Sequence, residues 1–437
     1  MKIFDGENTI FALYNAYRNG SIKPSDIITK HLDLIANIDQ HIGSYQEVWN
    51  EEAIKAGAAA DIALESGGDL GVLHGIPFAL KDIFHVKGKK TTFGSAVLTD
   101  QISQETGTLV RRLRNAGAII LGKSKTVECA FGGWGTNQMM GTPRNPWDTK
   151  NFRICGGSSS GSAAAVASRM AVFGIGSDTG GSVRLPAGFC GLVGLKPTAG
   201  ILPLDGVAPL SQTLDSPGPI SQSVFDAAIL FQVILGQENW QIEQSISSES
   251  DFFPNYHKGL TGLRLGIIDE NERAICSSGI LKSYDNSIKL ITNLGASVEV
   301  FKSPFRYKDL ADANGAIIAI EGYSNHSQLY SDPNLPTDKD VRTRMLAGKN
   351  YSATEYLKIL LDRKKMMVKF FDSLGYVDAL LMPTTTSTAI EISKVDQKIS
   401  PAHFTRPFNF LGMCALAIPI GLDNNDLPTS LQIVARP

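Results

Sequence analysis

The sequence has few cysteines, almost no net charge and no long uninterrupted apolar run. It contains five cysteines in 437 residues, an odd number without regular spacing. A chain of this length does not need disulfide bonds as staples, so we expect reduced thiols in a cytoplasm. The 41 basic and 43 acidic side chains give a formal net charge of −2, which provides no field to attract a nucleic-acid backbone or an anionic membrane. Nucleic-acid and membrane partners are therefore not expected.

No stretch approaches the roughly 18 consecutive apolar residues of a membrane span. Asp5 and Glu7 interrupt the N-terminal segment, where a signal peptide would need apolar residues. Hydrophobic residues make up 43% of the chain and charged residues 19%, which is typical of a compact globule and not of a disordered chain. The composition predicts a soluble, cytoplasmic protein.

Helical and strand patterns alternate along the chain. Ser25 is placed to cap a helix with apolar residues at positions 28, 32, 35 and 38. Further helices are predicted at about 51–65, 279–294 and 354–373, and short apolar strands at 75–82, 118–121, 263–268, 297–301 and 377–382. Because these strands lack polar–apolar alternation, we expect a single large α/β domain with a central mixed, mostly parallel β-sheet covered by helices on both faces.

Glycine is concentrated in one segment. Of the 45 residues from Gly156 to Gly200, 11 are Gly and seven are Ser. Glycine allows positive φ and lets backbone N–H groups approach a ligand without a Cβ in the way. A flexible linker is excluded because apolar segments that need burial, such as Ala163–Ala167 and Val172–Ile175, interrupt the run. The segment is therefore predicted to be an ordered, turn-rich core element.

Two short motifs in or near this region do not fit their usual context. Gly117–Ser124 matches the phosphate-loop pattern, but its variable positions are Ala-Ile-Ile-Leu, which predicts a buried strand and not a loop around phosphate. Gly157–Gly161 matches the G-x-S-x-G elbow of α/β-hydrolases, with Ser159 as nucleophile. The segment before it is a poor strand, and His257, His326 and His403 downstream stand in no distinctive context. An esterase of that class remains a minor alternative.

A larger set of segments fits one family. They are Gly75–Asp82, Asn145–Asp148, Gly156–Ala165, Gly176–Pro186, Phe189–Thr198 and Thr213–Pro219. In this order they closely resemble the amidase signature family of serine hydrolases. The resemblance is strong over about residues 20–235, fades through 240–370, and returns in Asp378–Pro383 and Phe408–Pro419.

The resemblance implies a catalytic triad of Lys81, Ser158 and Ser182. Ser182 is the expected nucleophile, Ser158 the cis-serine that relays protons, and Lys81 the general base. A lysine that accepts a proton near pH 7 must lose most of its preference for charge, which burial could supply. No metal or cofactor is expected.

The resemblance also implies substrate-binding positions. The backbone amides of Thr179, Gly180, Gly181 and Ser182 are expected to bind the oxyanion, and Ala130 matches a position where the family touches substrate through its backbone. Trp134 could pack in the wall or contact substrate.

Each assignment has a plainer alternative. Lys81 could be a surface lysine paired with Asp82, and Ser158 could cap the helix that starts near Ser160. Arg184 is expected to brace its loop against an acid such as Asp178, and not to bind a substrate carboxylate. Cys190, in an apolar setting, is predicted to be inert core.

The resemblance predicts one amidase domain over 1–437, with a signature core at about 70–235 and a divergent, pocket-building region at about 240–410. Phe404, Phe408, Phe410 and Leu411 suggest an apolar acyl pocket. The chain stops at Val434–Pro437, where such folds usually continue into a helix, so we expect a C-terminal truncation.

The predicted activity is hydrolysis of a small-molecule amide to a carboxylate and ammonia or an amine, in a monomer or a homodimer. The alternative is a glutamyl-tRNA amidotransferase A-like subunit that works in a complex. That subunit usually carries Gln where this chain has Leu185, so the stretch around Leu185 looks more like stand-alone amidases acting on small or aryl amides.

Overall fold

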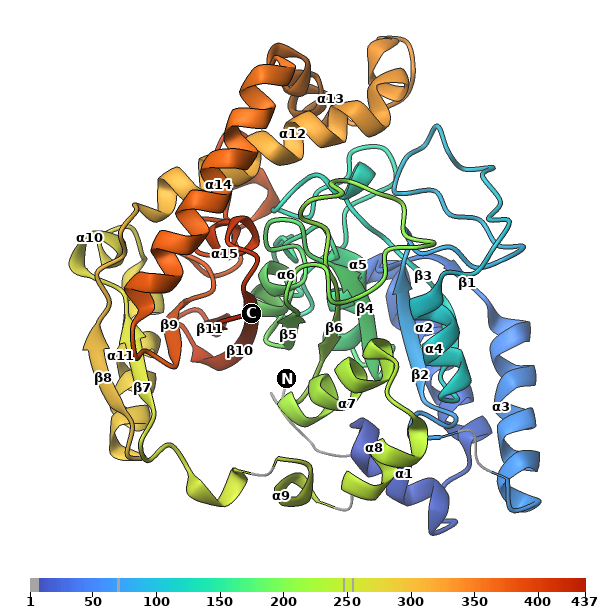
Figure 1. Cartoon of the computed structure of the whole chain (residues 1–437). Coiled ribbons are helices and arrows are strands. Elements are labelled where there is room, and N and C mark those ends of the chain that lie inside the picture. Colours follow the sequence, from blue (N-terminus) through green and yellow to red (C-terminus); the bar gives the residue numbers. More distant parts are fainter. Residues whose placement is uncertain (1–7, 69–70, 247, 254) are drawn as a thin grey trace.

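A sheet of 11 strands runs through the part of the chain that this computed structural model describes, residues 8–68, 71–246, 248–253 and 255–437 (Figure 1). The strands lie in the order β1-β3-β2-β4-β6-β5-β10-β11-β9-β7-β8. Their bounds are β1 Tyr45–Val48, β2 Pro77–Lys81, β3 Ile119–Ser124, β4 Phe173–Ser177, β5 Val193–Lys196, β6 Pro217–Ser221, β7 Arg264–Ile267, β8 Ser297–Val300, β9 Ala379–Pro383, β10 Cys414–Leu422 and β11 Pro428–Ala435. The N-terminal segment with Asp5 and Glu7 lies outside the described residues.

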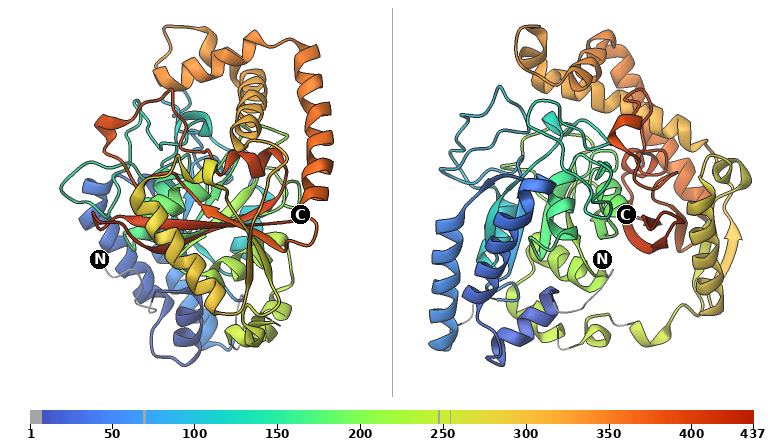
Figure 2. Two further views of the ribbon diagram at one scale, coloured as in Figure 1. Left: turned by 90° about the vertical axis from the view of Figure 1, so that its left-hand side faces the viewer. Right: turned by 180° about the vertical axis from the view of Figure 1, so that it is seen from behind.

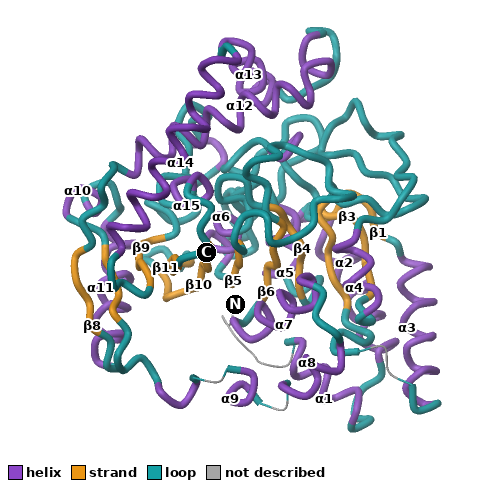
Figure 3. Tube along the Cα trace, viewed as in Figure 1, coloured by secondary structure: helices purple, strands orange, loops and turns teal. Residues whose placement is uncertain are grey.

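Helices surround this sheet on both sides (Figure 3). The α-helices are α1 Ile10–Arg18, α2 Pro24–Ile42, α3 Asn50–Glu65, α4 Thr108–Asn115, α5 Ser160–Ala167, α6 Arg184–Cys190, α7 Val224–Leu235, α8 Asn239–Ser245, α9 Glu249–Phe252, α10 Glu270–Arg273, α11 Ser278–Asn293, α12 Tyr307–Ser331, α13 Lys339–Ala347, α14 Ala353–Leu374 and α15 Arg406–Phe410. Short 3₁₀ turns are η1 Glu128–Ala130, η2 Tyr256–Lys258, η3 Gly348–Asn350 and η4 Ile392–Lys394.

The single α/β domain and its mixed sheet confirm the predicted fold class, but the expectation of a mostly parallel sheet is wrong. Among the described strands, β2–β3, β2–β4, β7–β8 and β7–β9 pair in parallel, and the other six pairings are antiparallel. The strands predicted from apolar runs are β2, β3, β7, β8 and β9, and their mutual pairings, β2–β3, β7–β8 and β7–β9, are all parallel. The centre of the sheet contains the hairpin β10–β11, whose short connection at 423–427 requires antiparallel strands.

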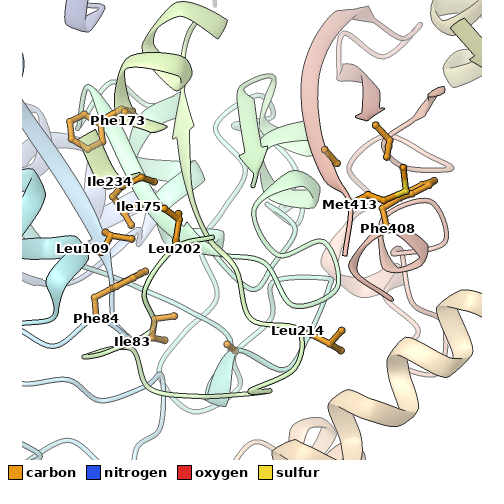
Figure 4. Close-up of a cluster of buried hydrophobic side chains, with 14 of the residues drawn as sticks. Ile83, Phe84, Leu109, Phe173, Ile175, Leu202, Leu214, Ile234, Phe408 and Met413 are labelled. Carbon is orange, nitrogen blue, oxygen red and sulfur yellow. The ribbon is translucent and has the colours of Figure 1, made fainter. Parts of the chain in front are cut away.

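Strand β2 shows how the sheet sends side chains to two faces. Phe78 and Leu80 belong to the buried cluster that also holds residues of α4 and α7, whereas Ala79 belongs to the cluster formed with α2 and α5. Successive side chains of a strand point to opposite faces, so Lys81, two residues after Ala79, is directed toward the face that α5 covers. Figure 4 shows part of the first cluster, with Phe173, Ile175 and Leu109 close to one another.

One helix start differs from the prediction. Helix α2 begins at Pro24 with Lys23 as its N-cap, and not with Ser25. The Ser25 hydroxyl instead donates to the Asp61 carboxylate of α3. Proline is favoured at the first helical position because it has no N–H to satisfy there. The helix therefore begins two residues earlier than an N-cap at Ser25 would place it.

Helices α12, α13 and α14 form a separate group that stands above one edge of the sheet (Figure 2). Helix α12 packs against α13, α14 and α15, so it connects this group to the centre of the molecule. Among the described residues, no helix has the length and apolar character needed to cross a membrane.

Candidate functional site

Lys81 ends strand β2 inside the protein. Its side chain is fully buried, and its Nζ lies 2.7 Å from Oγ of Ser158 and 2.9 Å from Oγ of Ser177. Burial lowers the pKa of Lys81 to about 7, although the carboxylates of Asp215 and Asp178 oppose this shift. The alternative of a surface lysine paired with Asp82 is wrong, because Asp82 forms a buried ion pair with Lys123 instead, with 2.8 Å between Nζ and Oδ1.

Ser158 precedes helix α5 and follows a cis peptide bond with Gly157. Its carbonyl oxygen accepts hydrogen bonds from Oγ1 of Thr126 at 3.0 Å and from the N–H of Val127 at 3.2 Å. The N-cap position of α5 belongs to Ser159, so Ser158 does not cap the helix. Its hydroxyl is directed to Lys81, as the resemblance implies.

The Asp178 carboxylate organises the loop that holds Ser182. It accepts hydrogen bonds from the N–H of Gly181 at 2.7 Å and of Val183 at 3.2 Å. The Arg184 guanidinium binds both carboxylate oxygens, at 2.9 and 3.0 Å. Burial would raise the pKa of Asp178, but Arg184 outweighs it and holds that pKa well below its usual range. Arg184 therefore braces the loop, as predicted.

The Gly181 N–H is already used by Asp178, so it is not free to bind an oxyanion. Gly181 serves the loop through its shape: its φ is +127°, and a Cβ there would meet Oγ1 of Thr405 at 2.3 Å. The N–H groups of Thr179, Gly180 and Ser182 therefore remain as the candidate oxyanion donors of this segment.

Thr179 is tied to a second buried acid. Its Oγ1 donates to Oδ1 of Asp215 at 2.6 Å, and Oδ2 of Asp215 accepts from the N–H groups of Leu210 and Ser211. Burial raises the pKa of Asp215 to about 6, against the opposing effect of these hydrogen bonds. Asp215 thus fixes the start of the 179–182 segment.

Ser182 opens onto a cavity of about 930 Å³. The cavity is lined by Ala130–Trp134, by Thr179, Gly180, Ser182 and Leu185, by residues of α12 and α13, and by residues 395–402 with Arg406. Ala130 lies in its wall with φ +55°, an uncommon backbone conformation for a residue with a Cβ. Trp134 also lines it, held by a 2.7 Å hydrogen bond from Nε1 to the carbonyl oxygen of Ile399.

Comparisons with known proteins agree with this geometry. The family model for amidases matches residues 26–437. The chain belongs to the amidase family. Over its full length it is 34% identical to the A subunit of the glutamyl-tRNA(Gln) amidotransferase of Geobacter metallireducens, of which it covers 95%.

Two solved structures resemble this amidase-family chain over most of their length. The first is the A subunit of the glutamyl-tRNA(Gln) amidotransferase from Thermotoga maritima, with a TM-score of 0.77, 31% identity and coverage of 94% of this chain and 88% of that one. The second is the peptide amidase from Stenotrophomonas maltophilia, with a TM-score of 0.83, 26% identity and coverage of 99% and 93%. The protein is therefore an amidase-signature hydrolase, related to enzymes that act on C–N bonds.

The predicted apolar acyl pocket of this amidase is wrong. Phe404, Phe408, Phe410 and Leu411 are almost completely buried in the main hydrophobic cluster and do not line the cavity (Figure 4 shows Phe408). Phe408 and Phe410 lie in α15, whose first residue, Arg406, lines the cavity instead.

Four residues of the amidase site were not found from the sequence. Ser177 contacts Lys81 and lies within the Gly176–Pro186 motif, so the motif itself could have indicated it. Thr405, Arg344 and Arg406 come from segments without a recognisable motif. Only the folded chain brings Thr405 to the 179–182 segment and both arginines to the cavity.

The phosphate-loop match and the G-x-S-x-G match have structural roles in this amidase. Gly117–Ser124 contributes the buried strand β3. Oγ of Ser159 lies 3.4 Å from both the backbone nitrogen and the carbonyl oxygen of Ser177.

The histidines and Cys190 have partners elsewhere in the fold. Nε2 of His326 forms a hydrogen bond with the carbonyl oxygen of Pro209, and Nε2 of His403 forms one with the carboxylate of Glu272. Cys190 is buried, with its thiol against the carbonyl oxygen of Cys155.

Proposed function

We propose that the protein hydrolyses the C–N bond of a carboxamide through an acyl-enzyme on Ser182. The observation that carries this proposal is the buried 2.7 Å contact between Nζ of Lys81 and Oγ of Ser158. The N–H of the next residue, Ser159, donates to the carbonyl oxygen of Ser182 at 3.2 Å, and Ser182 opens onto the cavity. A lysine whose pKa lies near 7 can act as a base at neutral pH. No histidine is required.

In the acylation step, neutral Lys81 takes the proton of Ser158 while Ser158 takes the proton of Ser182. Oγ of Ser182 then forms a bond to the amide carbon, and the carbonyl electron pair moves to its oxygen. As the tetrahedral intermediate collapses, the C–N bond breaks and the relay returns the proton to the leaving nitrogen, which departs as ammonia or an amine. Water repeats the sequence on the ester and releases the carboxylate.

The oxyanion of this intermediate would be bound by backbone amides of the 179–182 segment. Three of them, those of Thr179, Gly180 and Ser182, are the proposed donors, and the Gly181 amide holds the loop to Asp178. The Asp215–Thr179 hydrogen bond would keep these donors in place before substrate binds.

The fate of the released nitrogen gives two candidate functions. A stand-alone amidase would release it, whereas one component of an amidotransferase would work with a partner protein. The names of the sequence relatives support the second candidate, because this chain covers 95% of the Geobacter amidotransferase protein. Leu185 supports the first, since it lines the cavity where such a protein usually carries Gln.

A covalent probe tests the shared chemistry. Purified protein is treated with a fluorophosphonate and weighed intact, beside Ser182→Ala, Ser158→Ala and Lys81→Ala. We expect one adduct on the wild type and none on Ser182→Ala. An adduct that persists undiminished in Ser182→Ala would overturn the assignment of the nucleophile.

The two candidates are separated by a substrate panel on the same preparations. Release of ammonia from aliphatic, aryl and peptide amides, and from glutamine, is measured for the isolated chain. Turnover of non-glutamine amides without a partner supports the stand-alone enzyme. Activity restricted to glutamine supports the amidotransferase component.

A further inference from the structure

The free backbone amides of the 179–182 segment are each backed by a carbonyl group that accepts a hydrogen bond. In a trans peptide the carbonyl of one residue and the N–H of the next point in opposite directions. A group that holds the carbonyl therefore also sets the direction of the N–H. The N–H groups of Thr179, Gly180 and Ser182 donate to no acceptor among the described residues. The carbonyl groups of the same three peptides belong to Asp178, Thr179 and Gly181.

The first and the last of these carbonyl groups are held by segments that resemble the family. Nδ2 of Asn409 in α15 donates to the carbonyl oxygen of Asp178 at 3.1 Å. The N–H of Leu185 in α6 donates to the carbonyl oxygen of Gly181 at 2.7 Å. Both donors thus come from stretches in which the sequence resemblance is clear.

The middle peptide, between Thr179 and Gly180, is held from helix α12, where the sequence resemblance fades. Nδ2 of Asn314 donates to the carbonyl oxygen of Thr179 at 3.4 Å. The Asn314 side chain is fully buried, and its Oδ1 has no hydrogen-bond partner among the described residues. A Cβ on Gly180 would lie 3.2 Å from this Oδ1. The amide of Asn314 therefore packs directly against the peptide whose N–H is a candidate oxyanion donor.

Packing alone does not explain an asparagine at position 314. A buried polar atom without a partner costs free energy, and each such atom in a folded protein calls for an explanation. A leucine of similar size would fill the same space without an unpaired oxygen. The contact of Asn314 with the Thr179–Gly180 peptide points to a role in the reaction.

Helix α12 is anchored to the same segment by a second route. About two turns beyond position 314, the Glu321 carboxylate accepts hydrogen bonds from the hydroxyl of Ser211 and from the N–H of Thr213. The loop that contains these residues leads to Asp215, which accepts the hydroxyl of Thr179. The position of α12 relative to this peptide is therefore set before substrate binds.

We propose that Asn314 is a positioning residue, which holds the Gly180 N–H in the direction of the developing oxyanion. The inference rests on the proposed function and adds a residue to it. The distance of 3.4 Å exceeds the roughly 2.7–3.2 Å of most N–H···O bonds, so this bond is weak in the resting enzyme. When Gly180 donates to a negative oxygen, the peptide is polarised and the Thr179 carbonyl becomes a stronger acceptor for Asn314. A bond that strengthens in the transition state raises kcat and leaves KM unchanged.

Asn314→Leu tests this role because it removes the donor and keeps the size of the side chain. The rate constant for phosphonylation of Ser182 by a fluorophosphonate should fall about 2- to 10-fold, as expected for one lost hydrogen bond. For any amide that the wild type turns over, kcat should fall by a similar factor with KM nearly unchanged. The Tm should stay the same or rise, because the unpaired Oδ1 is removed as well. An unchanged rate, whatever the Tm, would overturn the inference.

Gln222→Met is the matched control. Nε2 of Gln222 is also a buried side-chain amide that donates to a backbone carbonyl at 3.4 Å, but its acceptor is Asn8, outside the site. This variant should leave the phosphonylation rate as it is in the wild type. Equal rate losses in Asn314→Leu and Gln222→Met would contradict a specific role of Asn314.

A measurement on the wild type covers the case in which Asn314→Leu fails to fold. Labelling with ¹³C-carbonyl threonine and ¹⁵N-glycine selects the amides of the Thr–Gly pairs, which stand at 106–107, 179–180 and 261–262. Thr106→Ser and Thr261→Ser identify the other two signals. Phosphonylation of Ser182 places a phosphonyl oxygen where the oxyanion would form, so the Gly180 amide proton should move downfield. A Gly180 signal that does not move would overturn the inference.

The outcomes stay distinct from those of the proposed function. A fluorophosphonate adduct that persists undiminished in Ser182→Ala refutes the proposed nucleophile, and this inference with it. A normal adduct on the wild type, formed at the same rate in Asn314→Leu, refutes only the role of Asn314.

Discussion

Nζ of Lys81 lies 2.7 Å from Oγ of Ser158, and neither side chain has any exposed surface. Strand β2 directs Lys81 to the face of the sheet that α5 covers, and Ser158 stands two residues before α5 begins. Two segments 77 residues apart in the sequence are thus joined where strand and helix pack. Several expectations depend on the protonation and burial of this pair.

The pH dependence of kcat/KM should report the protonation of Lys81. Its pKa of about 7 means that the neutral base is present above pH 7 and is lost below it. We therefore expect a plateau above about pH 8 and a fall of about tenfold per pH unit below pH 6. A profile that stays flat down to pH 5 would contradict a neutral lysine as the base.

Asp215→Asn provides the control for this profile, because Asp215 has a pKa of about 6. Its carboxylate raises the pKa of Lys81, so its removal should shift the midpoint of the profile toward lower pH. Disappearance of the acid limb would instead assign the titration to Asp215.

Lys81→Met should abolish activity and yet stabilise the fold. The folded protein lowers the pKa of Lys81, which means that the charged amine destabilises the folded state. Its replacement by an apolar side chain should therefore raise the free energy of unfolding. Below pH 7 the amine is protonated in both the folded and the unfolded protein, so the full destabilisation by the buried charge applies. Between pH 7 and 10 the unfolded chain binds more protons than the folded protein does, so the stability of the wild type rises with pH. The gain in Tm of Lys81→Met should therefore be largest below pH 7 and shrink toward pH 10. A Tm below that of the wild type at pH 6 would refute this.

Ser158→Ala should lower kcat with little change in KM. The hydroxyl accepts a hydrogen bond from Lys81, and removal of a positioned proton-transfer group typically costs about 10² to 10⁴ in rate. Steady-state kinetics on any amide that the wild type turns over will measure the effect. A loss confined to KM would assign Ser158 a binding role only.

The sequence predicted the parts of the site that lie within continuous motifs. Lys81 could be predicted to be buried because it ends an apolar strand, and Arg184 to brace its loop because Asp178 is six residues away. The oxyanion segment was predicted as four amides, but the Asp178 carboxylate takes the Gly181 amide. A motif indicates which residues are near one another and not which donors are already used.

The parts that could not be predicted depend on packing between distant segments. Phe408 and Phe410 form an apolar stretch that suits a pocket or a core equally well, and only the direction of α15 decides between them. The antiparallel centre of the sheet follows from the β10–β11 hairpin. The Asn424-Asn425-Asp426 turn indicates a hairpin, but the apolar runs used to predict the strands carry no information on strand direction.

Lys123→Met tests a buried ion pair outside the site. Lys123 and Asp82 are almost fully buried, so the variant would leave the Asp82 carboxylate without its ion-pair partner. Removal of one member of such a pair typically costs about 3–5 kcal/mol, measured as the free energy of unfolding in urea. Lys358→Met, which removes an exposed partner of Asp362, should change it little. Equal effects of the two variants would show that Asp82 is compensated by other groups, such as Thr92.

Thr405→Val tests whether the 402–406 segment positions the oxyanion donors. Oγ1 of Thr405 donates to the carbonyl oxygen of Gly180 at 2.8 Å and occupies the space left by the missing Cβ of Gly181. Valine has the same shape but no hydroxyl, so the loop loses one hydrogen bond, worth about 0.5–1.5 kcal/mol. If the bond holds the amides of Thr179 and Gly180 toward the developing charge, kcat should fall about 2- to 10-fold with KM nearly unchanged, and Thr405→Ser should restore it. If kcat is unchanged while the Tm falls, the bond stabilises the fold without positioning the donors.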